Sequence, residues 1–312
     1  MTARAWMGMA LAMLAIGGAV DARAWSGRDP LPPVPCSFFP ADNVWNADVS
    51  ALPVHPRSAE YVASIGAGLG LHPDFGTRKI GIPYAVADAA QVPVRVVFTA
   101  YGDESDPGPY PIPRGAPIER GSDHHVLVVQ AGTCRLYELF AARRRSGYWA
   151  AASGASWDLG SNALRPPTWT SADAAGLPIL PGLARYDEVA SGAITHALRF
   201  TAPRTQSAYL WPARHQASAD SDATLPPMGL RVRLKADVDI SAFSPTNQVI
   251  LTALKRYGML LADNGGAWFV TGAPDPRWNN GDLGNLHGIT GSSFEAIDES
   301  GLMVDPDSGQ VH

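Results

Sequence analysis

Lysine and cysteine are both scarce in this 312-residue chain. Lysine occurs only as Lys79, Lys235 and Lys255, so arginine supplies almost all of the 24 basic residues. A planar guanidinium binds carboxylates through paired hydrogen bonds, although a GC-rich genome produces the same bias and is the simpler explanation. The two cysteines are too few and too far apart in sequence to form a zinc site by themselves.

The compact motifs of several enzyme classes are absent. The chain has no G-x-x-x-x-G-K-[ST] loop and no G-x-G-x-x-G after a predicted strand, which argues against phosphate and dinucleotide binding. It also lacks a G-x-S-x-G nucleophile turn and an H-E-x-x-H helix. The classes that remain draw their functional residues from separate strands, and we expect no cofactor.

The first 24 residues have the pattern of a secretory signal peptide. Arg4 is followed by an apolar run from about Met7 to Val20 and by the triplet Ala22-Arg23-Ala24, which matches an A-x-A cleavage site. A retained membrane anchor is the alternative, but the run is short for a spanning helix. We predict a mature chain that begins at Trp25 and is periplasmic or extracellular.

The charge of the mature chain argues against two kinds of partner. Without Arg4, Arg23 and Asp21 it has 22 basic and 28 acidic residues, a net charge of −6. A negative chain is a poor ligand for nucleic acid or for an anionic membrane surface. No later segment has the long apolar run of a membrane helix, so we predict no membrane insertion after signal cleavage, and a monomer.

Cys36 and Cys134 form an even pair in a chain that we expect to be exported. Oxidising compartments favour disulfides. We therefore predict a Cys36–Cys134 bridge that joins the mature N-terminal segment to a central strand.

The periodicity predicts a mainly β protein with a single domain over residues 57–312, preceded by an extended proline-rich lead-in over residues 25–56. Short apolar segments separated by turn residues indicate a β-sandwich or jelly roll with few helices. Residues 124–132 and 133–140 predict a hairpin, and residues 259–272 predict another around Asn264-Gly265. We also expect strands at residues 192–200, 206–215 and 229–235, a short helix capped by Ser58, a single helical turn at residues 171–176, and a short helix near residues 283–287.

The clearest helix is predicted over about residues 245–257. Ser244 is a good N-cap, Pro245 occupies the first helical position, and Gly258 follows the last apolar residue. We expect this helix to cover one face or edge of the sheets.

The stretch from Ser156 to His215 combines charged side chains, tryptophan and apolar residues more evenly than any other part of the chain. A charged residue in an apolar segment is either paired or lies in a functional cleft. We therefore expect the site here, together with Glu138 on the predicted strand 135–140. Candidate substrate-binding residues are Asn162, Arg165, Trp169, Arg199, Trp211 and His215.

A carboxylate pair is the first candidate for the chemistry. Glu138 shares a strand face with Leu136 and Phe140, which predicts either an arginine partner or a raised pKa. Asp158 or Asp173 can supply the ionised partner that glycoside cleavage requires. The alternative is a buried Glu–Arg pair in which the tryptophans belong to the core.

Histidine offers two further candidates. His196 can act as a general base in a hydrolase or lyase, with Arg199 or Arg165 neutralising a substrate carboxylate. A weaker alternative is a metal held by His125, Glu138, His196 and His215. A histidine that is hydrogen-bonded within the core explains the same pattern.

Four strings resemble a family of secreted bacterial proteins of unknown function: FPADNVWNADVSALPVHP, SNALRPPTWTSADAAGLPILPGL, GAITHALRF and YLWPARH. The resemblance runs from Pro40 to about Trp278. It implies secretion but no activity and no functional residues.

These observations favour a secreted protein that acts on a polysaccharide or oligosaccharide. We expect a hydrolase or lyase with an acid–base pair drawn from Glu138, Asp158, Asp173 and His196. The alternatives are a carbohydrate-binding protein without activity and a structural envelope protein with a buried ion-pair network.

Overall fold

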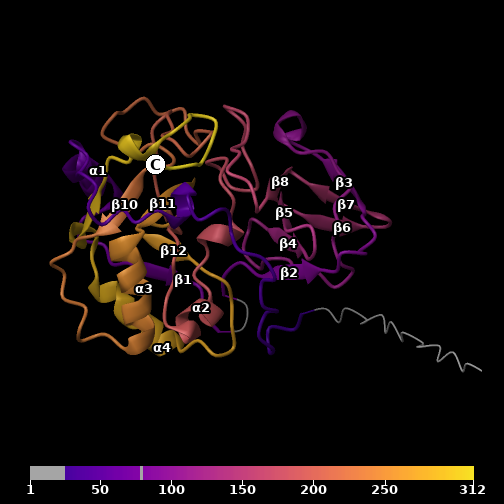
Figure 1. Ribbon diagram of the computed structural model, residues 1–312, viewed down its shortest axis with the longest axis horizontal. Helices are drawn as coiled ribbons and strands as arrows, with labels where there is room; N and C mark the ends of the chain where they lie inside the picture. Colours follow the sequence, from indigo (N-terminus) through magenta and orange to yellow (C-terminus); the bar gives the residue numbers. More distant parts are fainter. Residues whose placement is uncertain (1–24, 78–79) are drawn as a thin grey trace, which may run out of the picture.

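The computed structural model describes residues 25–77 and 80–312, so the predicted signal peptide lies outside it. The described chain is mainly β, as predicted, with three mixed sheets and few short helices. The six-stranded sheet carries most of the helices, and the two smaller sheets form the opposite end of the molecule (Figure 1). No helix among the described residues is long and apolar enough to cross a membrane.

The large sheet has the strand order β1-β12-β9-β11-β10-β13. Its strands are β1 (His72–Asp74), β9 (Leu198–Ala202), β10 (Arg231–Leu234), β11 (Met259–Asn264), β12 (Phe269–Thr271) and β13 (Phe294–Ala296). The α-helices are α1 (Ser58–Ile65), α2 (Tyr186–Ser191), α3 (Pro245–Arg256) and α4 (Asn280–Leu283).

The other end consists of two sheets packed face to face. One has the order β2-β4-β5-β8 and the other the order β3-β7-β6. Buried side chains that include Val128, Leu139 and Trp149 fill the space between them. The second face of β4 and β5, with Leu127 and Leu136, joins the core of the large sheet. The strands are β2 (Tyr84–Ala87), β3 (Arg95–Phe98), β4 (Val126–Gln130), β5 (Arg135–Phe140), β6 (Arg143–Arg145), β7 (Tyr148–Ala151) and β8 (Ser153–Asp158).

Short 3-10 helices mark several connections. They are η1 (Val44–Asn46), η2 (Gly102–Glu104), η3 (Leu180–Gly182), η4 (Gly284–Gly288), η5 (Gly291–Ser293) and η6 (Ser300–Leu302). The expected helix near residues 283–287 is divided between α4 and η4.

Helix α3 confirms the sequence prediction. The Ser244 hydroxyl accepts the backbone N–H of Asn247, and Pro245 is the first helical residue. Ile250 and Leu254 are buried on its apolar stripe. Local sequence signals were enough to predict this helix, because the N-cap residue, the apolar periodicity and the glycine after the helix all indicate the same bounds.

The predicted hairpin at residues 124–140 is confirmed, but the one around Asn264-Gly265 is wrong. β11 and β12 do not pair with each other, since β9 lies between them, parallel to β11 and antiparallel to β12. The chain instead crosses the end of β9, where a Cβ on Gly265 would come 2.8 Å from the Thr201 hydroxyl oxygen. An apolar run predicts that a strand forms, but it does not determine which other strand pairs with it.

Three other local predictions differ from the structure. Residues 171–176 form a turn in which the Ser171 hydroxyl accepts the Asp173 N–H, and residues 206–215 contain no strand. Ser58 begins α1 rather than capping it, because its hydroxyl accepts the N–H of Ala296. In each case a tertiary or side-chain hydrogen bond replaces the expected local one.

Cys36 and Cys134 are bridged, as predicted, across 98 residues of sequence. The bridge ties the proline-rich lead-in to the turn between β4 and β5. It is consistent with an extracellular or periplasmic compartment.

Reduction of this bridge should destabilise the fold by about 2–4 kcal/mol, because the unfolded chain regains the entropy of a long loop. We expect Cys36→Ser/Cys134→Ser to melt several degrees below the parent in thermal denaturation. An unchanged melting temperature would show that native contacts alone hold the lead-in.

Candidate functional site

A cleft of about 290 Å³ lies where the small sheets meet the large one. We call it the acid cleft. Clefts between structural units are common ligand sites. It is lined by Tyr101, Phe140, Ser153, Thr170, Ser171, Ala172, Asp173, Ala174, His215, Gln216, Ala217, Asp263 and Asn264.

Asp173 enters the acid cleft from the connecting segment between β8 and β9. Its two carboxylate oxygens accept hydrogen bonds from Nε and Nη2 of Arg199, at 2.9 and 2.8 Å. Arg199 lies on β9 and also donates to the Thr271 hydroxyl at 2.6 Å. Both charged side chains are almost fully buried. This two-point pairing gives the Asp173 carboxylate a buried counter-charge.

Asp263 enters the same cleft from the end of β11 and has a different environment. The register of β11 against β9 shifts between Leu261 and Asp263, so Ala262 is an extra residue. Bulges of this kind redirect side chains near functional sites. Burial, followed by repulsion from Asp173, raises the pKa of Asp263 to about 7. The cleft therefore holds one carboxylate that is paired with an arginine and one whose pKa lies near neutrality.

His215 is the third titratable group of the acid cleft. Its Nδ1 donates to the carbonyl of Ala174 at 2.9 Å, so Nε2 is the ring nitrogen that makes no hydrogen bond. That Nε2 lies 4.0 Å from a carboxylate oxygen of Glu104. Nε2 is thus the nitrogen of His215 that a bound water or substrate can reach.

The proline- and glycine-rich loop at residues 101–123 supports one wall of the cleft. Glu104 accepts the backbone N–H of Thr170 at 2.8 Å, and Asp106 pairs with Arg165. Arg165 is buried, and its guanidinium lies over the rings of Trp157 and Trp169. Arg165 and Trp169, two predicted substrate-binding residues, therefore hold the cleft wall.

Glu138 lies outside the lining of the acid cleft. It is fully buried on β5, where both oxygens accept the N–H of Ile179 and one also accepts that of Leu180. Burial raises its pKa to about 7, as its apolar surroundings predicted. In this geometry Glu138 holds the segment that begins η3.

The structure brings Asp173, Arg199 and His215 together and places other predicted residues elsewhere. Asp158 is exposed and accepts the N–H of Gly160. His196 is buried beside Glu188. Asn162 bonds to Asp42 and Asn43 of the lead-in, and Trp211, half-buried, donates to the Ser308 carbonyl.

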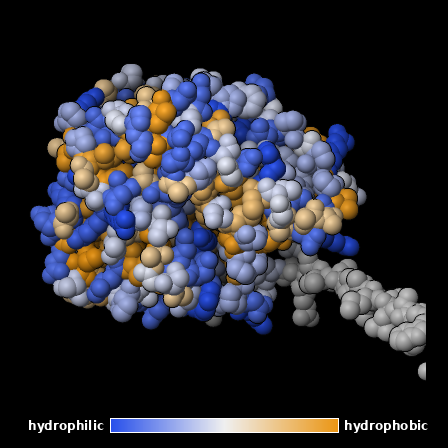
Figure 2. Space-filling view, viewed as in Figure 1, coloured by the Kyte–Doolittle hydropathy of each residue, from blue (hydrophilic) through white to orange (hydrophobic). Residues whose placement is uncertain are grey.

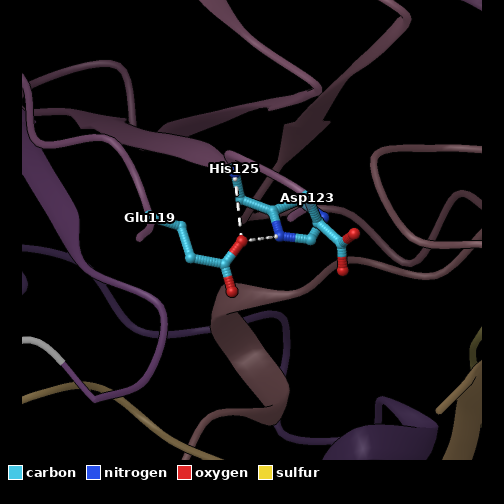
Figure 3. Close-up of side chains that lie close together, drawn as sticks. All are labelled: Glu119, Asp123 and His125. Carbon is cyan, nitrogen blue, oxygen red and sulfur yellow. Dashed lines mark hydrogen bonds and ion pairs between the residues drawn. The ribbon is translucent and has the colours of Figure 1, made fainter. Parts of the chain in front are cut away.

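One group of at least three potential metal ligands occurs within the described chain. It consists of Glu119, Asp123 and His125 (Figure 3), so it does not unite His125 with Glu138, His196 and His215. His125 Nδ1 lies 2.6 Å from Glu119, and its Nε2 lies 3.0 Å from the carbonyl of Ala172. Because both nitrogens face acceptors, the ring carries two protons and has no lone pair for a metal. The group is better described as an ion pair.

This ion pair should give stability a distinct pH dependence. Burial alone would lower the pKa of His125, but the Glu119 hydrogen bond and charge outweigh it and raise the pKa. The pKa of Glu119 is lowered by the same pair, against its own burial. The pair therefore stabilises the fold most between about pH 4.5 and 6.5, the usual values of the two groups, and its contribution is lost as pH rises through the raised pKa of His125.

We expect Glu119→Gln to lose about 1–3 kcal/mol of unfolding free energy at pH 6. The deficit should shrink as pH rises through the raised pKa of His125, so it should be smaller at pH 9 than at pH 6. Urea denaturation of both proteins at the two pH values measures this. A deficit that is constant with pH would contradict a charged His125.

Sequence reasoning missed Asp263 and the contribution of Glu104. Asp263 ends the apolar run Met259–Ala262, and a carboxylate at the end of a buried strand is a usable signal.

Comparison of the chain with known protein families, with curated proteins and with solved structures finds no match.

Proposed function

We propose that this is a secreted carbohydrate-active hydrolase that cleaves an uncharged oligosaccharide or polysaccharide in the acid cleft. One observation carries the proposal: two carboxylates of the same cleft have opposite environments. Asp173 is paired with Arg199, whereas the pKa of Asp263 is raised to about 7. Glycoside hydrolysis requires such a division between a proton donor and an ionised group.

The atoms that are not already hydrogen-bonded decide the role of each side chain in the proposed reaction. Asp263 donates its proton to the departing glycosidic oxygen. His215 Nε2 accepts a proton from the attacking water, whose oxygen bonds to the anomeric carbon as the glycosidic bond breaks. Both Asp173 oxygens are occupied by Arg199, so Asp173 does not attack; its charge helps to raise the pKa of Asp263.

The lining favours hydrolysis of a neutral sugar over β-elimination on a uronate. Elimination needs a cation beside the substrate carboxylate, and no arginine or lysine is among the residues that line the cleft. Arg199 lies behind Asp173 and donates to Asp173 and Thr271. An acidic cleft would repel a uronate.

The remaining lining suits a saccharide. Tyr101 and Phe140 provide aromatic surface for a sugar face, and Gln216 and Asn264 provide amides for hydroxyl groups. No histidine in the described chain bonds to a serine hydroxyl. This absence argues against a serine–histidine nucleophile.

A glycan panel tests the proposal. The purified mature protein is incubated with neutral and uronate-containing polysaccharides, and both reducing ends and unsaturated products absorbing near 235 nm are measured. We expect reducing ends from a neutral glycan and no unsaturated product. Unsaturated product would establish a lyase, and binding of glycans without any cleavage would establish a carbohydrate-binding protein.

A further inference from the structure

Unpaired arginines gather at the end of the molecule formed by the β3-β7-β6 sheet. Ten of the arginines in the described chain form ion pairs. Eight do not, and six of these lie on or beside this sheet. No ion pair or side-chain hydrogen bond within the described chain involves these six, and all are exposed: Arg95, Arg114, Arg120, Arg143, Arg144 and Arg145.

Three of them lie on the outer face of the sheet. The register aligns Arg95 with Tyr148 of β7, and Tyr148 with Arg145 of the edge strand β6. Arg143 lies two residues from Arg145 and so shares its face. Strand spacing places Arg95 and Arg145 roughly 10 Å apart, and Arg143 and Arg145 about 7 Å apart. The inner face carries Trp149 of the core, so this basic face points away from the molecule (Figure 1).

The other three surround a pocket of about 380 Å³. Arg114, Arg120 and Arg144 line it together with Trp25 and Ile118, and its lining contains no carboxylate. Arg144 belongs to β6 and lies over the ring of Trp149, 5.1 Å from its centre. The pocket therefore begins at the edge of the basic face. We call the two together the arginine surface. It shares no lining residue with the acid cleft.

We propose that the arginine surface binds a polysaccharide that carries carboxylates, such as a polyuronate, separately from the acid cleft. An exposed guanidinium without an acidic partner offers a paired donor that matches a carboxylate. Several guanidiniums within roughly 10 Å of one another can hold successive carboxylates of one chain. The rings of Tyr148 and Trp25 add faces on which sugars can lie.

The surroundings favour this ligand over two other polyanions. Double-stranded DNA carries one negative charge per roughly 1.7 Å of its axis, which is a far higher charge density than the roughly 7–10 Å spacing of the arginines can match. In Figure 2 the right-hand end of the molecule, where this sheet lies, mixes hydrophilic residues with small apolar patches, which gives a lipid bilayer little to bury. The choice of a saccharide rests on the proposed function. In that scheme the surface holds an acidic matrix while the cleft acts on a neutral glycan.

The experiment measures binding of the mature protein to polygalacturonate by affinity electrophoresis and calorimetry. Arg143→Ala/Arg145→Ala should weaken binding about tenfold or more, and binding should weaken as salt rises. The matched control, Arg204→Ala/Arg256→Ala, removes the same charge from exposed arginines elsewhere and should bind like the parent.

The outcomes separate the two proposals. Absence of polygalacturonate binding by the parent, or equal loss in both double variants, would overturn the arginine surface. So would equal or tighter binding to double-stranded DNA or to phosphatidylglycerol vesicles at the same salt. A parent protein that binds polygalacturonate but cleaves no glycan would disprove only the hydrolase. Asp263→Asn, which lacks the proposed acid of the cleft, should still bind polygalacturonate like the parent.

Discussion

Asp263→Asn should lower the hydrolase rate by about 10²–10⁴-fold, the usual contribution of a positioned general acid. Asparagine keeps the shape of the side chain but has no acidic proton for the leaving oxygen. The parent should lose activity as pH rises through the Asp263 pKa of about 7, whereas the residual activity of the variant should lack that limb. Initial rates of reducing-end release from pH 5 to 9 measure both effects.

Stability distinguishes this role from a structural one. The pKa of Asp263 is raised in the folded state, so ionisation favours the unfolded chain and costs the parent stability as pH rises from about 4 to 7. Asp263→Asn should therefore be at least as stable as the parent at pH 8. Asp158→Asn, which alters an exposed carboxylate outside the cleft, serves as the matched activity control. A fully active Asp263→Asn would remove the basis of the proposed function.

Asp173→Asn should lose about 3–5 kcal/mol of unfolding free energy, because it leaves the buried guanidinium of Arg199 without its counter-charge. Both partners are shielded from water, with side-chain exposures of 4% for Arg199 and 0% for Asp173. Urea denaturation at pH 7 measures the loss. The matched control is Asp48→Asn, which breaks an exposed pair with Arg256 and should cost about 1 kcal/mol or less.

A double variant covers the case in which Asp173→Asn does not fold. Asp173→Leu/Arg199→Met removes both charges and should recover much of the stability, since no buried charge remains uncompensated. It should still lack activity, because the ionised carboxylate of the cleft is gone. Equal losses for Asp173→Asn and Asp48→Asn would show that burial does not strengthen the Asp173–Arg199 pair.

Local signals in the sequence determined part of this protein. Helix α3 followed from Ser244, Pro245 and the apolar spacing, and the β4–β5 hairpin followed from two adjacent apolar runs. The mainly β class and the disulfide also followed, because composition and an even cysteine pair depend little on the path of the chain. Asp173, Arg199 and His215 were selected as candidates because charged groups in apolar segments need partners or a function.

Tertiary structure alone decided which of those residues meet. β9 pairs between β11 and β12, a choice that apolar runs of similar character cannot specify, and this pairing places Arg199 opposite Asp173 and ends β11 at the acid cleft. The same packing buries Glu138 away from the cleft and gives Asp263 its raised pKa. The pKa of a carboxylate depends on burial and on charges brought close by distant parts of the chain, so its protonation state is a property of the fold.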